Sequence, residues 1–444
     1  MSDYLIRGGR VVDPAAGTDR LADVLVRDGS ISGVGGDLDA SGAEVLDAQG
    51  AVVAPGLVDL HCHLREPGRE DEETIGSASR AAAAGGYTAV CAMPNTDPVA
   101  DSAAIVEQVW AAGRAAGLVH VVPAGAISRE QEGLRLADIG EMARSAARVR
   151  IFTDDGRGVQ SSLFARRAME YIAGFDGIYA EHCEDESLAA GGQMHEGERS
   201  AVLGLRGIPS EAEELMAARD IVLARLTGCR LHLLHVSCAR TVELVRRAKG
   251  EGIRVTAEAT PHHFTLTDAA LEGYDPNAKV QPPLRAESDR SAVIAGLADG
   301  TLDAIATDHA PHALEEKDQE LTFAPPGMVG LELALGLTLT ELVEPGHLTL
   351  AEALNRLSTA PARLLGLDGH GGPIAPGAPA NLVVFDPAVA WQVDPAGFHS
   401  KSRNTPFGGH KLKGRVIHTL FGGHPTVVDG ELTARDEAES LVAR

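Results

Sequence analysis

Two histidines and an arginine alternate in the segment GLVDLHCHLR, at His61, His63 and Arg65. The segment has the character of a buried β-strand, in which every second side chain points to the same face. The two imidazoles would therefore converge, and convergent neutral imidazoles at a strand end suit Zn²⁺. The spacing predicts a metal site, although two solvated histidines remain the alternative on this motif alone.

Further metal-binding residue types stand where later apolar runs end. These candidates are Asp154, Asp155, His182, His235 and Asp308. With His61 and His63 they supply enough imidazoles and carboxylates for two metal ions that share a bridging carboxylate and a bridging oxygen derived from water. Successive strand residues point to opposite faces, so the residues alone leave open whether Asp154 or Asp155 is the bridge.

The elements that must position these residues are eight short apolar runs in the middle of the chain. The runs are GLVDLHCH, YTAVCAMPN, LVHVVPAGA, VRIFTDD, GIYAEHC, RLHLLHVS, IRVTAEATPHH and LDAIATDHA. Helical segments follow most of them, for example EETIGSASRAAAAGG and ARTVELVRRAKGEG. This alternation predicts an α/β fold with a closed (β/α)₈ TIM-like barrel at residues 56–369, whose active site lies at the carboxyl ends of the strands.

Both ends of the chain show a different pattern. Short alternating segments such as YLIRGGRVVDP, ADVLVRDGSISGVG, ANLVVFDP and GRVIHTLFGG are separated by Gly and Pro. Such segments are typical of strands in a β-sandwich. We therefore expect residues 1–55 and 370–444 to form one small β-sandwich domain built from both termini.

The overall charge and the cysteines narrow the class of protein. The formal net charge is −24, which argues against a nucleic acid or an anionic membrane as partner. A small anionic substrate stays compatible if local cations hold it. No secretory signal or membrane-length apolar run is seen, so we expect a cytoplasmic protein. The five cysteines form no CxxC pair, so neither a disulfide framework nor a thiolate zinc site is expected.

Several other histidines compete with the candidates. His232 lies three positions before His235 and would point to the opposite strand face, so we expect it to pack outward against a helix. His262 and His263 end the seventh run and could approach the site, but ligation by either is disfavoured. His309 could support the metal ligands from behind, and His312 could reach a substrate.

Ordered motifs along nearly the whole chain resemble the dihydroorotases of the amidohydrolase superfamily, and most closely their bacterial type I branch. The motifs are HCHLREPG, MPNT, FTDDG, EHCED, GLRGIPSEAEE, HVS, AEATPHH, PPLR and TDHAPH. The resemblance implies a two-zinc enzyme that reversibly hydrolyses L-dihydroorotate to N-carbamoyl-L-aspartate in pyrimidine (UMP) biosynthesis.

The resemblance also implies roles for individual residues. His61 and His63 would bind one zinc, His182 and His235 the other, and Asp155 would bridge both. Asp308 would ligate a zinc and act as general acid and base. The implied substrate contacts are His63, Arg65, Asn95, Gln281, His312, Pro326 and Gly327.

One implied contact departs from the pattern. Gln281 stands where the resemblance predicts Asn, which keeps the amide but changes its reach by one methylene. The polar stretch 312–323 lacks an apolar period and could be a mobile lid.

Two other functions stay open on the sequence. Dihydropyrimidinases, hydantoinases and allantoinases share this architecture, but they commonly bridge their metals with a carbamylated lysine, and FTDDG contains none. An inactive partner subunit is the second alternative, which the complete set of six ligand positions disfavours. A homodimer and a complex with aspartate transcarbamoylase are both compatible with the resemblance.

Overall fold

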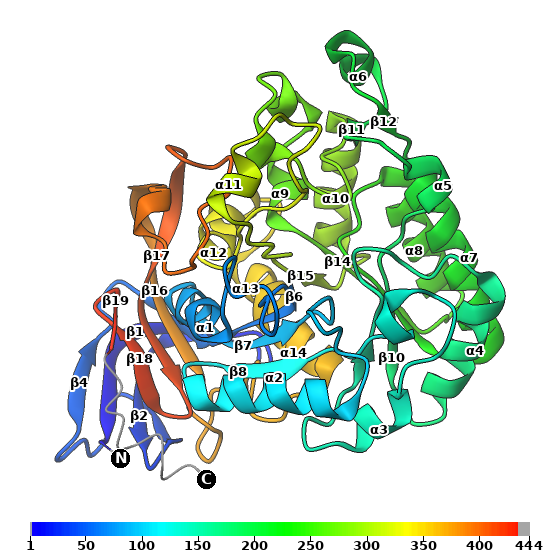
Figure 1. The fold of residues 1–444 in the computed structure, drawn as a ribbon. Helices are drawn as coiled ribbons and strands as arrows, with labels where there is room; N and C mark the ends of the chain where they lie inside the picture. Colours follow the sequence, from blue (N-terminus) through cyan, green and yellow to red (C-terminus); the bar gives the residue numbers. More distant parts are fainter. Residues whose placement is uncertain (1, 434–444) are drawn as a thin grey trace.

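The computed structural model describes residues 2–433, which form a layer of strands from both chain ends beside a larger body of helices around parallel strands (Figure 1). The strands of the larger body are β6 (Leu57–Cys62), β7 (Tyr87–Ala92), β8 (His120–Pro123), β9 (Ile151–Phe152), β10 (Ile178–Glu181), β13 (Arg230–Leu233), β14 (Val255–Ala259) and β15 (Ala304–Ile305). Each lies in one of the eight predicted runs, so the predicted strands are confirmed.

These strands pair in parallel within two sheets. One has the order β6-β7-β8 and the other β15-β14-β13-β10-β9. Isolated parallel bridges between Gly125 and Phe152, and between Cys62 and His309, join the sheets at both edges. All the carboxyl ends of parallel strands therefore point the same way, which is the arrangement that gathers the candidate residues.

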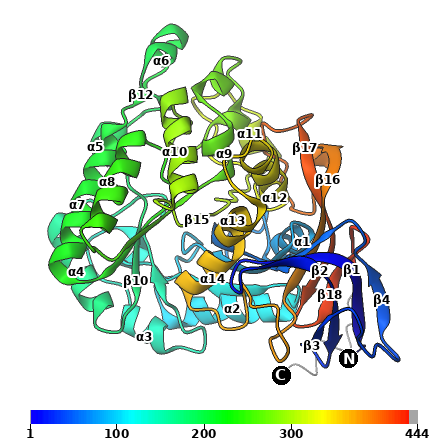
Figure 2. The same cartoon turned by 180° about the vertical axis from the view of Figure 1, so that it is seen from behind.

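Helices connect and cover the parallel strands (Figure 2). They include α1 (Ile75–Ala84), α2 (Ala103–Ala116), α3 (Ile139–Arg144), α4 (Ser162–Ala173), α7 (Glu211–Thr227), α8 (Ala239–Gly250), α10 (Glu287–Asp299), α12 (Ala334–Thr338), α13 (Leu350–Leu354) and α14 (Ala360–Leu365). Thr74 caps the N-terminus of helix α1, because its side chain accepts a hydrogen bond from the backbone N–H of Ser77. Helix α8 buries Val242 and Val245 on one face, as its apolar period predicts.

Three excursions leave this body at the carboxyl ends of the strands. The first, between β10 and α7, contains α5 (Glu186–Ala189), β11 (Met194–His195), α6 (Glu198–Leu203) and β12 (Gly207–Ile208), and α6 stands out from the body in Figure 1. The other two contain α9 (Pro261–Thr265) and α11 (Leu314–Lys317). Loops of this kind carry the binding groups of many β/α folds.

Strands from both termini form one nine-stranded sheet. They are β1 (Tyr4–Asp13), β2 (Thr18–Arg27), β3 (Ser30–Gly35), β4 (Glu44–Asp47), β5 (Val52–Pro55), β16 (Leu382–Gln392), β17 (Lys411–Phe421), β18 (His424–Val428) and β19 (Glu431–Leu432). Antiparallel pairing of β5 with β16 joins the two ends of the chain. The expected sandwich is thus one continuous sheet, and side chains of β1, β2, β16 and β17 share a single buried core.

The remaining features agree with the composition. All five cysteines are buried, and they form no disulfide within the described chain. Among residues 2–433, no helix is both long and apolar enough to cross a membrane.

Candidate metal centre and active site

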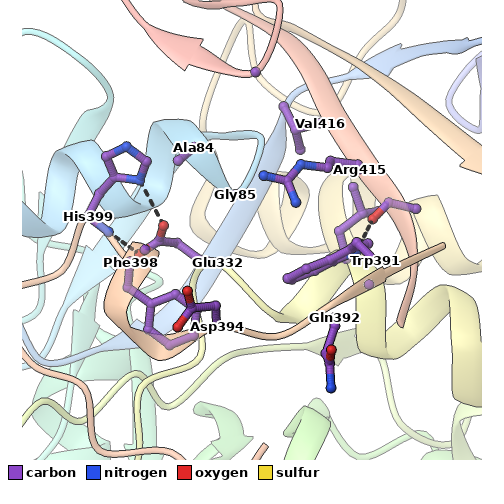
Figure 3. A pocket seen from close by; sticks show the side chains of 15 residues that line it. Ala84, Gly85, Glu332, Trp391, Gln392, Asp394, Phe398, His399, Arg415 and Val416 are labelled. Atoms are coloured by element: carbon purple, nitrogen blue, oxygen red, sulfur yellow. Dashed lines mark hydrogen bonds and ion pairs between the residues drawn. The ribbon is translucent and has the colours of Figure 1, made fainter. Parts of the chain in front are cut away.

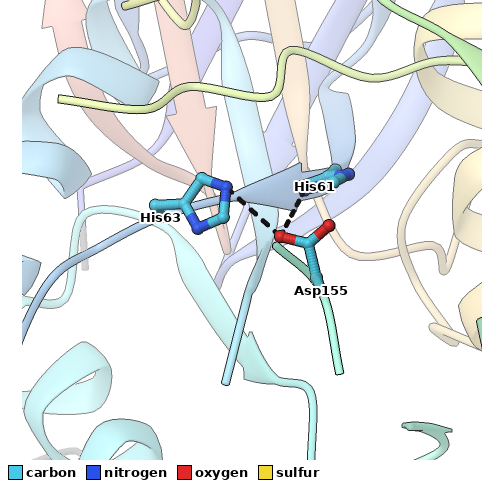
Figure 4. Close-up of side chains that lie close together, drawn as sticks. All are labelled: His61, His63 and Asp155. Atoms are coloured by element: carbon cyan, nitrogen blue, oxygen red, sulfur yellow. Dashed lines mark ion pairs between the residues drawn. The ribbon is translucent and has the colours of Figure 1, made fainter. Parts of the chain in front are cut away.

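Five strand ends bring the six candidate ligands together in the buried interior. His61 belongs to β6 and His63 follows it, while Asp155, His182, His235 and Asp308 lie within three residues after β9, β10, β13 and β15. All six side chains are almost completely buried. Figure 4 shows His61 and His63 converging on Asp155 from the end of β6.

The first cluster contains four donor atoms. His61 Nε2 and His63 Nε2 lie 3.4 and 3.5 Å from Asp155 Oδ2, and 3.5 and 3.1 Å from Asp308 Oδ1. A tetrahedral ion with bonds of about 2.0 Å separates its ligands by about 3.3 Å. The spacing of this cluster therefore fits one metal ion.

The second cluster uses the other oxygen of the same aspartate. Asp155 Oδ1 lies 3.5 Å from His182 Nδ1 and 3.5 Å from His235 Nε2, and the two nitrogens are 2.9 Å apart. Each carboxylate oxygen of Asp155 thus faces one cluster. A carboxylate placed in this way can bridge two metal ions.

Unsatisfied polar atoms mark the same place. His61 Nε2, Asp155 Oδ1 and His182 Nε2 are buried without a hydrogen-bond partner within residues 2–433. Leaving such groups unpaired in the interior costs about 1–3 kcal/mol each. A bound cation would satisfy the first two atoms, so the residues fit a metal site.

The electrostatics point in the same direction. Burial alone would lower the pKa of His61, but the carboxylates of Asp155 and Asp308 outweigh it and raise that pKa well above its ordinary value. Burial would raise the pKa of Asp155, yet the surrounding imidazoles lower it well below the usual range. The negative potential that holds protons on these imidazoles would equally attract a divalent cation.

The neighbouring Asp154 has a different partner set. Its Oδ1 accepts hydrogen bonds from the backbone of Ile127 and Ser128 at 2.9 and 3.0 Å, and Ser128 Oγ donates to Oδ2. Asp154 therefore ties β9 to the segment after β8. Of the two adjacent aspartates, only Asp155 reaches the histidines.

Asp59 and Thr307 position Asp308 beside the histidines. The buried Asp59 on β6 accepts hydrogen bonds from Thr307 N at 2.9 Å and Thr307 Oγ1 at 2.5 Å. Asp308 itself has a φ of 46°, a backbone conformation that a non-glycine residue rarely adopts. Strain of this kind persists only where the surroundings impose it, and here it directs the carboxylate into the site.

The expectation that His232 packs outward against a helix is wrong. Its Nε2 lies 3.0 Å from Glu258 Oε2 in the buried interior, and its Nδ1 lies 2.9 Å from Thr256 Oγ1. The alternation argument failed because β13 ends at Leu233 and His235 has a φ of 30°. His235 therefore reaches the site by a turn of the backbone, while His232 stays on the inward face.

Glu258 connects this histidine to the first cluster. Its Oε1 lies 2.9 Å from His61 Nδ1. A carboxylate at that position fixes the ring orientation and the tautomer in which Nε2 is free to bind metal. Glu258 is therefore a positioning residue for the candidate ligand His61.

Glu258→Gln is expected to lower the affinity of the first cluster for a metal ion by about 10–100-fold, because an amide cannot accept from both histidines. Competition with a chromogenic chelator would measure the change. Glu243→Gln, the same change on the surface of α8, should leave the affinity unaltered. An unchanged affinity in Glu258→Gln would remove Glu258 from this role.

Arg65 lies at the edge of the clusters in a tight polar environment. Its Nε donates to Pro311 O at 3.1 Å and lies 2.8 Å from Glu72 Oε2, and its Nη2 lies 3.5 Å from His312 Nε2. The ion pair with Glu72 holds one edge of the guanidinium.

The predicted lid segment is held by two buried lysines. Lys279 Nζ donates to the carbonyls of Leu321 and Ala324 at 2.8 and 2.7 Å, and Lys317 Nζ donates to those of Pro325 and Gly327 at 2.9 and 3.0 Å. Burial lowers the pKa of Lys317 to about 7. The mobility of this segment remains a prediction.

The predicted substrate contacts in this segment bond to the protein itself. His312 Nε2 lies 2.9 Å from Pro326 O, and Gly327 N donates to Lys279 O at 2.8 Å. Asn404, from the segment before β17, donates to Gly327 O at 3.1 Å. A substrate would have to replace some of these bonds to contact Pro326 or Gly327.

Two amide side chains complete the surroundings. Asn95 Oδ1 lies 2.9 Å from His63 Nδ1, so Asn95 orients that ring. Gln281 Nε2 donates to Glu184 Oε1. An ionised carboxylate only accepts hydrogen bonds, so the Gln281 nitrogen must face Glu184 and its oxygen must point away.

The other competing histidines lie outside the two clusters. His263 lies 2.7 Å from Thr260 Oγ1 and 3.1 Å from Pro282 O. His309 lies 3.3 Å from Glu73 Oε2 and accepts from Gly330 N. His262 is buried, and its Nε2 has no hydrogen-bond partner within residues 2–433.

A separate cavity of about 280 Å³ lies between α1, α12 and strands β16 and β17 (Figure 3). Trp391, Arg415 and the ion pair of His399 with Glu332 contribute to its lining. None of the six candidate ligands is among its lining residues. The metal clusters and this cavity are therefore distinct parts of the molecule.

Proteins of known name match the chain over almost its whole length. A protein named dihydroorotase from Pelotomaculum thermopropionicum is 52% identical over 425 residues, which cover 96% of this chain and 98% of that protein. A dihydroorotase from Streptomyces coelicolor is 51% identical over 433 residues, covering 98% and 100%. The chain belongs to the dihydroorotase family. The resemblance of its motifs to that family is thereby confirmed.

A family model agrees with this family, and solved structures agree with the fold. The family model described as Dihydro-orotase-like matches residues 50–241, which contain five of the six candidate ligands. An L-hydantoinase from Arthrobacter aurescens is similar in structure with a TM-score of 0.87 and 26% identity, covering 98% of both chains. A dihydropyrimidinase from Brevibacillus agri has the same fold, with a TM-score of 0.85 and 24% identity over 97% of this chain and 96% of that one.

The sequence analysis did not predict several residues that surround the candidate metal centre of this member of the dihydroorotase family. They are Glu72, Glu184, Glu258, Lys279, Lys317 and Asn404. Glu258 lies in the middle of the seventh predicted strand run, inside the motif AEATPHH, and an acidic residue between two alanines of a strand was the available signal. The lysines and Asn404 have no comparable signal, because their partners are backbone carbonyls.

Proposed function

We propose that the chain is a dihydroorotase, which reversibly hydrolyses L-dihydroorotate to N-carbamoyl-L-aspartate in the synthesis of UMP. One observation carries the proposal. Two candidate metal clusters share Asp155 at one end of the parallel strands, in a chain about half identical to proteins named dihydroorotase.

Two zinc ions per chain are the proposed cofactors. His61, His63, Asp155 and Asp308 would hold the first, and Asp155, His182 and His235 the second. Mixed imidazole and carboxylate donors suit Zn²⁺. Bound there, the ions would lower the pKa of a water molecule to about 7 and polarise the cyclic amide carbonyl.

Asp308 is the proposed general base and general acid. Its carboxylate would accept a proton from the attacking water and then pass that proton to the departing ring nitrogen. In the ring-forming direction the same carboxylate would act in reverse order. Its position among His61 and His63, at 3.5 and 3.1 Å, supports this role.

The substrate contacts are proposed from the same surroundings. The Nη atoms of Arg65 would bind the substrate carboxylate, and Glu72 would orient the guanidinium from the other edge. His63, Asn95, Gln281, His312 and the backbone of Pro326 and Gly327 would contact the ring. Gln281 would present its amide oxygen, since Glu184 engages its nitrogen.

Arg65→Lys is expected to raise KM for dihydroorotate by about 10–100-fold, because an ammonium cannot make the paired contacts of a guanidinium. Steady-state kinetics with dihydroorotate, dihydrouracil, hydantoin and allantoin test both this role and the proposed function. The wild-type chain should strongly prefer dihydroorotate. The Arg65→Lys variant should turn over dihydroorotate less efficiently than the wild-type chain does. Its activity on the uncharged rings should be unchanged. Preference of the wild-type chain for an uncharged ring would reject the proposal.

A hydantoinase or dihydropyrimidinase is the alternative that the structural neighbours favour. The relatives at about 50% identity are instead named dihydroorotase. In addition, Asp155 stands where the alternative would be expected to have a bridging lysine. The same substrate panel separates the two.

We further propose that the parallel strands close into a (β/α)₈ barrel, since bridges join both edges of the two sheets. The proposed division of the chain is residues 56–369 for the barrel and 1–55 with 370–444 for the small β domain; residues 434–444 lie outside the described structure. A cytoplasmic location and binding to aspartate transcarbamoylase remain proposals from the family resemblance.

A further inference from the structure

A buried carboxylate holds the turn that carries the candidate ligand His235. His235 has a φ of 30°, which a non-glycine residue rarely adopts. The backbone that follows is bound to Glu213 in the first turn of helix α7: Ser237 N and Cys238 N donate to Glu213 Oε1 at 3.2 and 3.1 Å. Ser237 Oγ also donates to Glu213 Oε2. Strained backbone persists only where neighbouring groups impose it, and Glu213 is placed to do so.

A guanidinium completes this arrangement. Arg285 Nε donates to Ser237 Oγ at 3.0 Å, and Arg285 Nη2 lies 3.7 Å from Glu213 Oε2. Arg285 Nη1 donates to Ile208 O at 3.0 Å, which ties the group to strand β12. Glu213, Ser237 and Arg285 are all almost completely buried. We call these three side chains the clamp.

The clamp contains a charged acceptor in the interior. Burial would raise the pKa of Glu213, but the guanidinium of Arg285 and the hydrogen bonds from Ser237 and Cys238 outweigh burial and lower that pKa. Hydrogen bonds to an ionised acceptor are about twice as strong as those between neutral groups. The ionised Glu213 therefore holds the backbone after His235 firmly.

The two metal clusters are supported in different ways. In the first cluster, Glu258 contacts the ring of His61 directly at Nδ1. In the second cluster, Asp155 is the only carboxylate among residues 2–433 that contacts a ring nitrogen of His182 or His235. The position of the His235 ring therefore depends on its backbone, which the clamp holds.

We infer that the clamp of Glu213, Ser237 and Arg285 positions His235 and thereby sets the affinity of the second cluster for a metal ion, while the first cluster is independent of it. The three side chains are positioning residues, since they act on the backbone next to a ligand and not on a metal-binding atom. The inference rests on the proposed binding of two metal ions.

Glu213→Gln tests the clamp. The amide has one acceptor oxygen in place of two, so its nitrogen must face N–H or O–H groups that now donate to the carboxylate. The dissociation constant of the second ion should rise about 10–100-fold, and that of the first should be unchanged. Glu214→Gln, the same change at the next, half-buried residue of α7, should leave both constants unaltered.

The measurement must separate the two ions. Competition of the full chain with a chromogenic chelator for Zn²⁺ gives both dissociation constants. Anomalous diffraction from crystals grown with limiting Zn²⁺ shows which cluster loses its ion first. A general loss of stability would shift both constants together, so the ratio of the two constants is decisive.

Ser237→Ala is a milder change that removes only the hydroxyl between Glu213 and Arg285. It should raise the dissociation constant of the second ion about 10-fold with the same selectivity. An unchanged ratio in Glu213→Gln, or in Ser237→Ala if the first variant does not fold, would overturn the clamp and leave the proposed function intact. A wild-type chain that binds fewer than two ions would overturn the inference and the proposed cofactors together.

Discussion

Asp308→Asn is expected to lower kcat for dihydroorotate by about 10³-fold while the protein still binds metal. The amide keeps an oxygen beside His61 and His63 but cannot accept and return a proton. General acid–base groups typically contribute about 10²–10⁴-fold to rate, and Asp308 would serve in both capacities. The buried surroundings and the hydrogen bonds of Asp59 to Thr307 should hold the new side chain in place.

The measurement pairs kcat with the metal content of the same sample. Asp303→Asn is the matched control, because Asp303 precedes the same strand, β15, at its opposite end and bonds to Lys249 and Ala257 N. That variant should keep nearly full activity. An Asp308→Asn enzyme with bound metal and more than about a tenth of wild-type kcat would contradict the proposed proton transfer. Loss of the metal together with activity would restrict Asp308 to ligation.

Removal of the metal is expected to abolish hydrolysis and to lower the thermal stability of the chain. Asp155 and Asp308 place two buried carboxylates beside four imidazoles, and several of their atoms lack partners. A cation bound to this set stabilises the folded state by about 2.7 kcal/mol when its free concentration is about 100 times Kd. Dialysis against a chelator should therefore lower Tm, and added Zn²⁺ should restore both Tm and activity.

Asp155→Ala provides the comparison for this experiment. Asp155 contributes an oxygen to each cluster, so its loss should weaken both sites and make Tm nearly insensitive to the chelator. Calorimetry and elemental analysis of the two proteins would show the difference. Full activity of a chain shown to be free of metal would contradict the proposed chemistry. An equal shift of Tm in both proteins would show that the shift does not come from metal bound at these clusters.

A buried network of side chains behind the first cluster explains the orientation of its ligand His61. His232, Glu258 and His61 form a buried chain of contacts at 3.0 and 2.9 Å from the strand interior to the candidate metal site. Burying the Glu258 carboxylate would be costly without these partners. The paired contacts lower its pKa to about 2 against the effect of burial, so the carboxylate stays charged and can orient His61.

The sequence by itself determined the elements and the identity of the clustered residues. The eight apolar runs predicted the parallel strands, because alternation with helical segments is a local pattern. The spacing of His61 and His63 predicted their convergence, because side-chain direction in a strand has a period of two. Strand order then requires residues at the carboxyl ends to meet.

Only the tertiary structure decided the features that depend on where a strand ends and on contacts between distant segments. The alternation rule failed at His232 because the backbone turns at His235, and no local pattern reports that turn. The tertiary structure also decided that Asp155 and not Asp154 faces the histidines, and that the terminal strands form one sheet. It further decided that Lys279 and Lys317 hold the segment around Gly327. Most of the deciding partners lie far apart along the chain, so propensity and spacing carry no information about them.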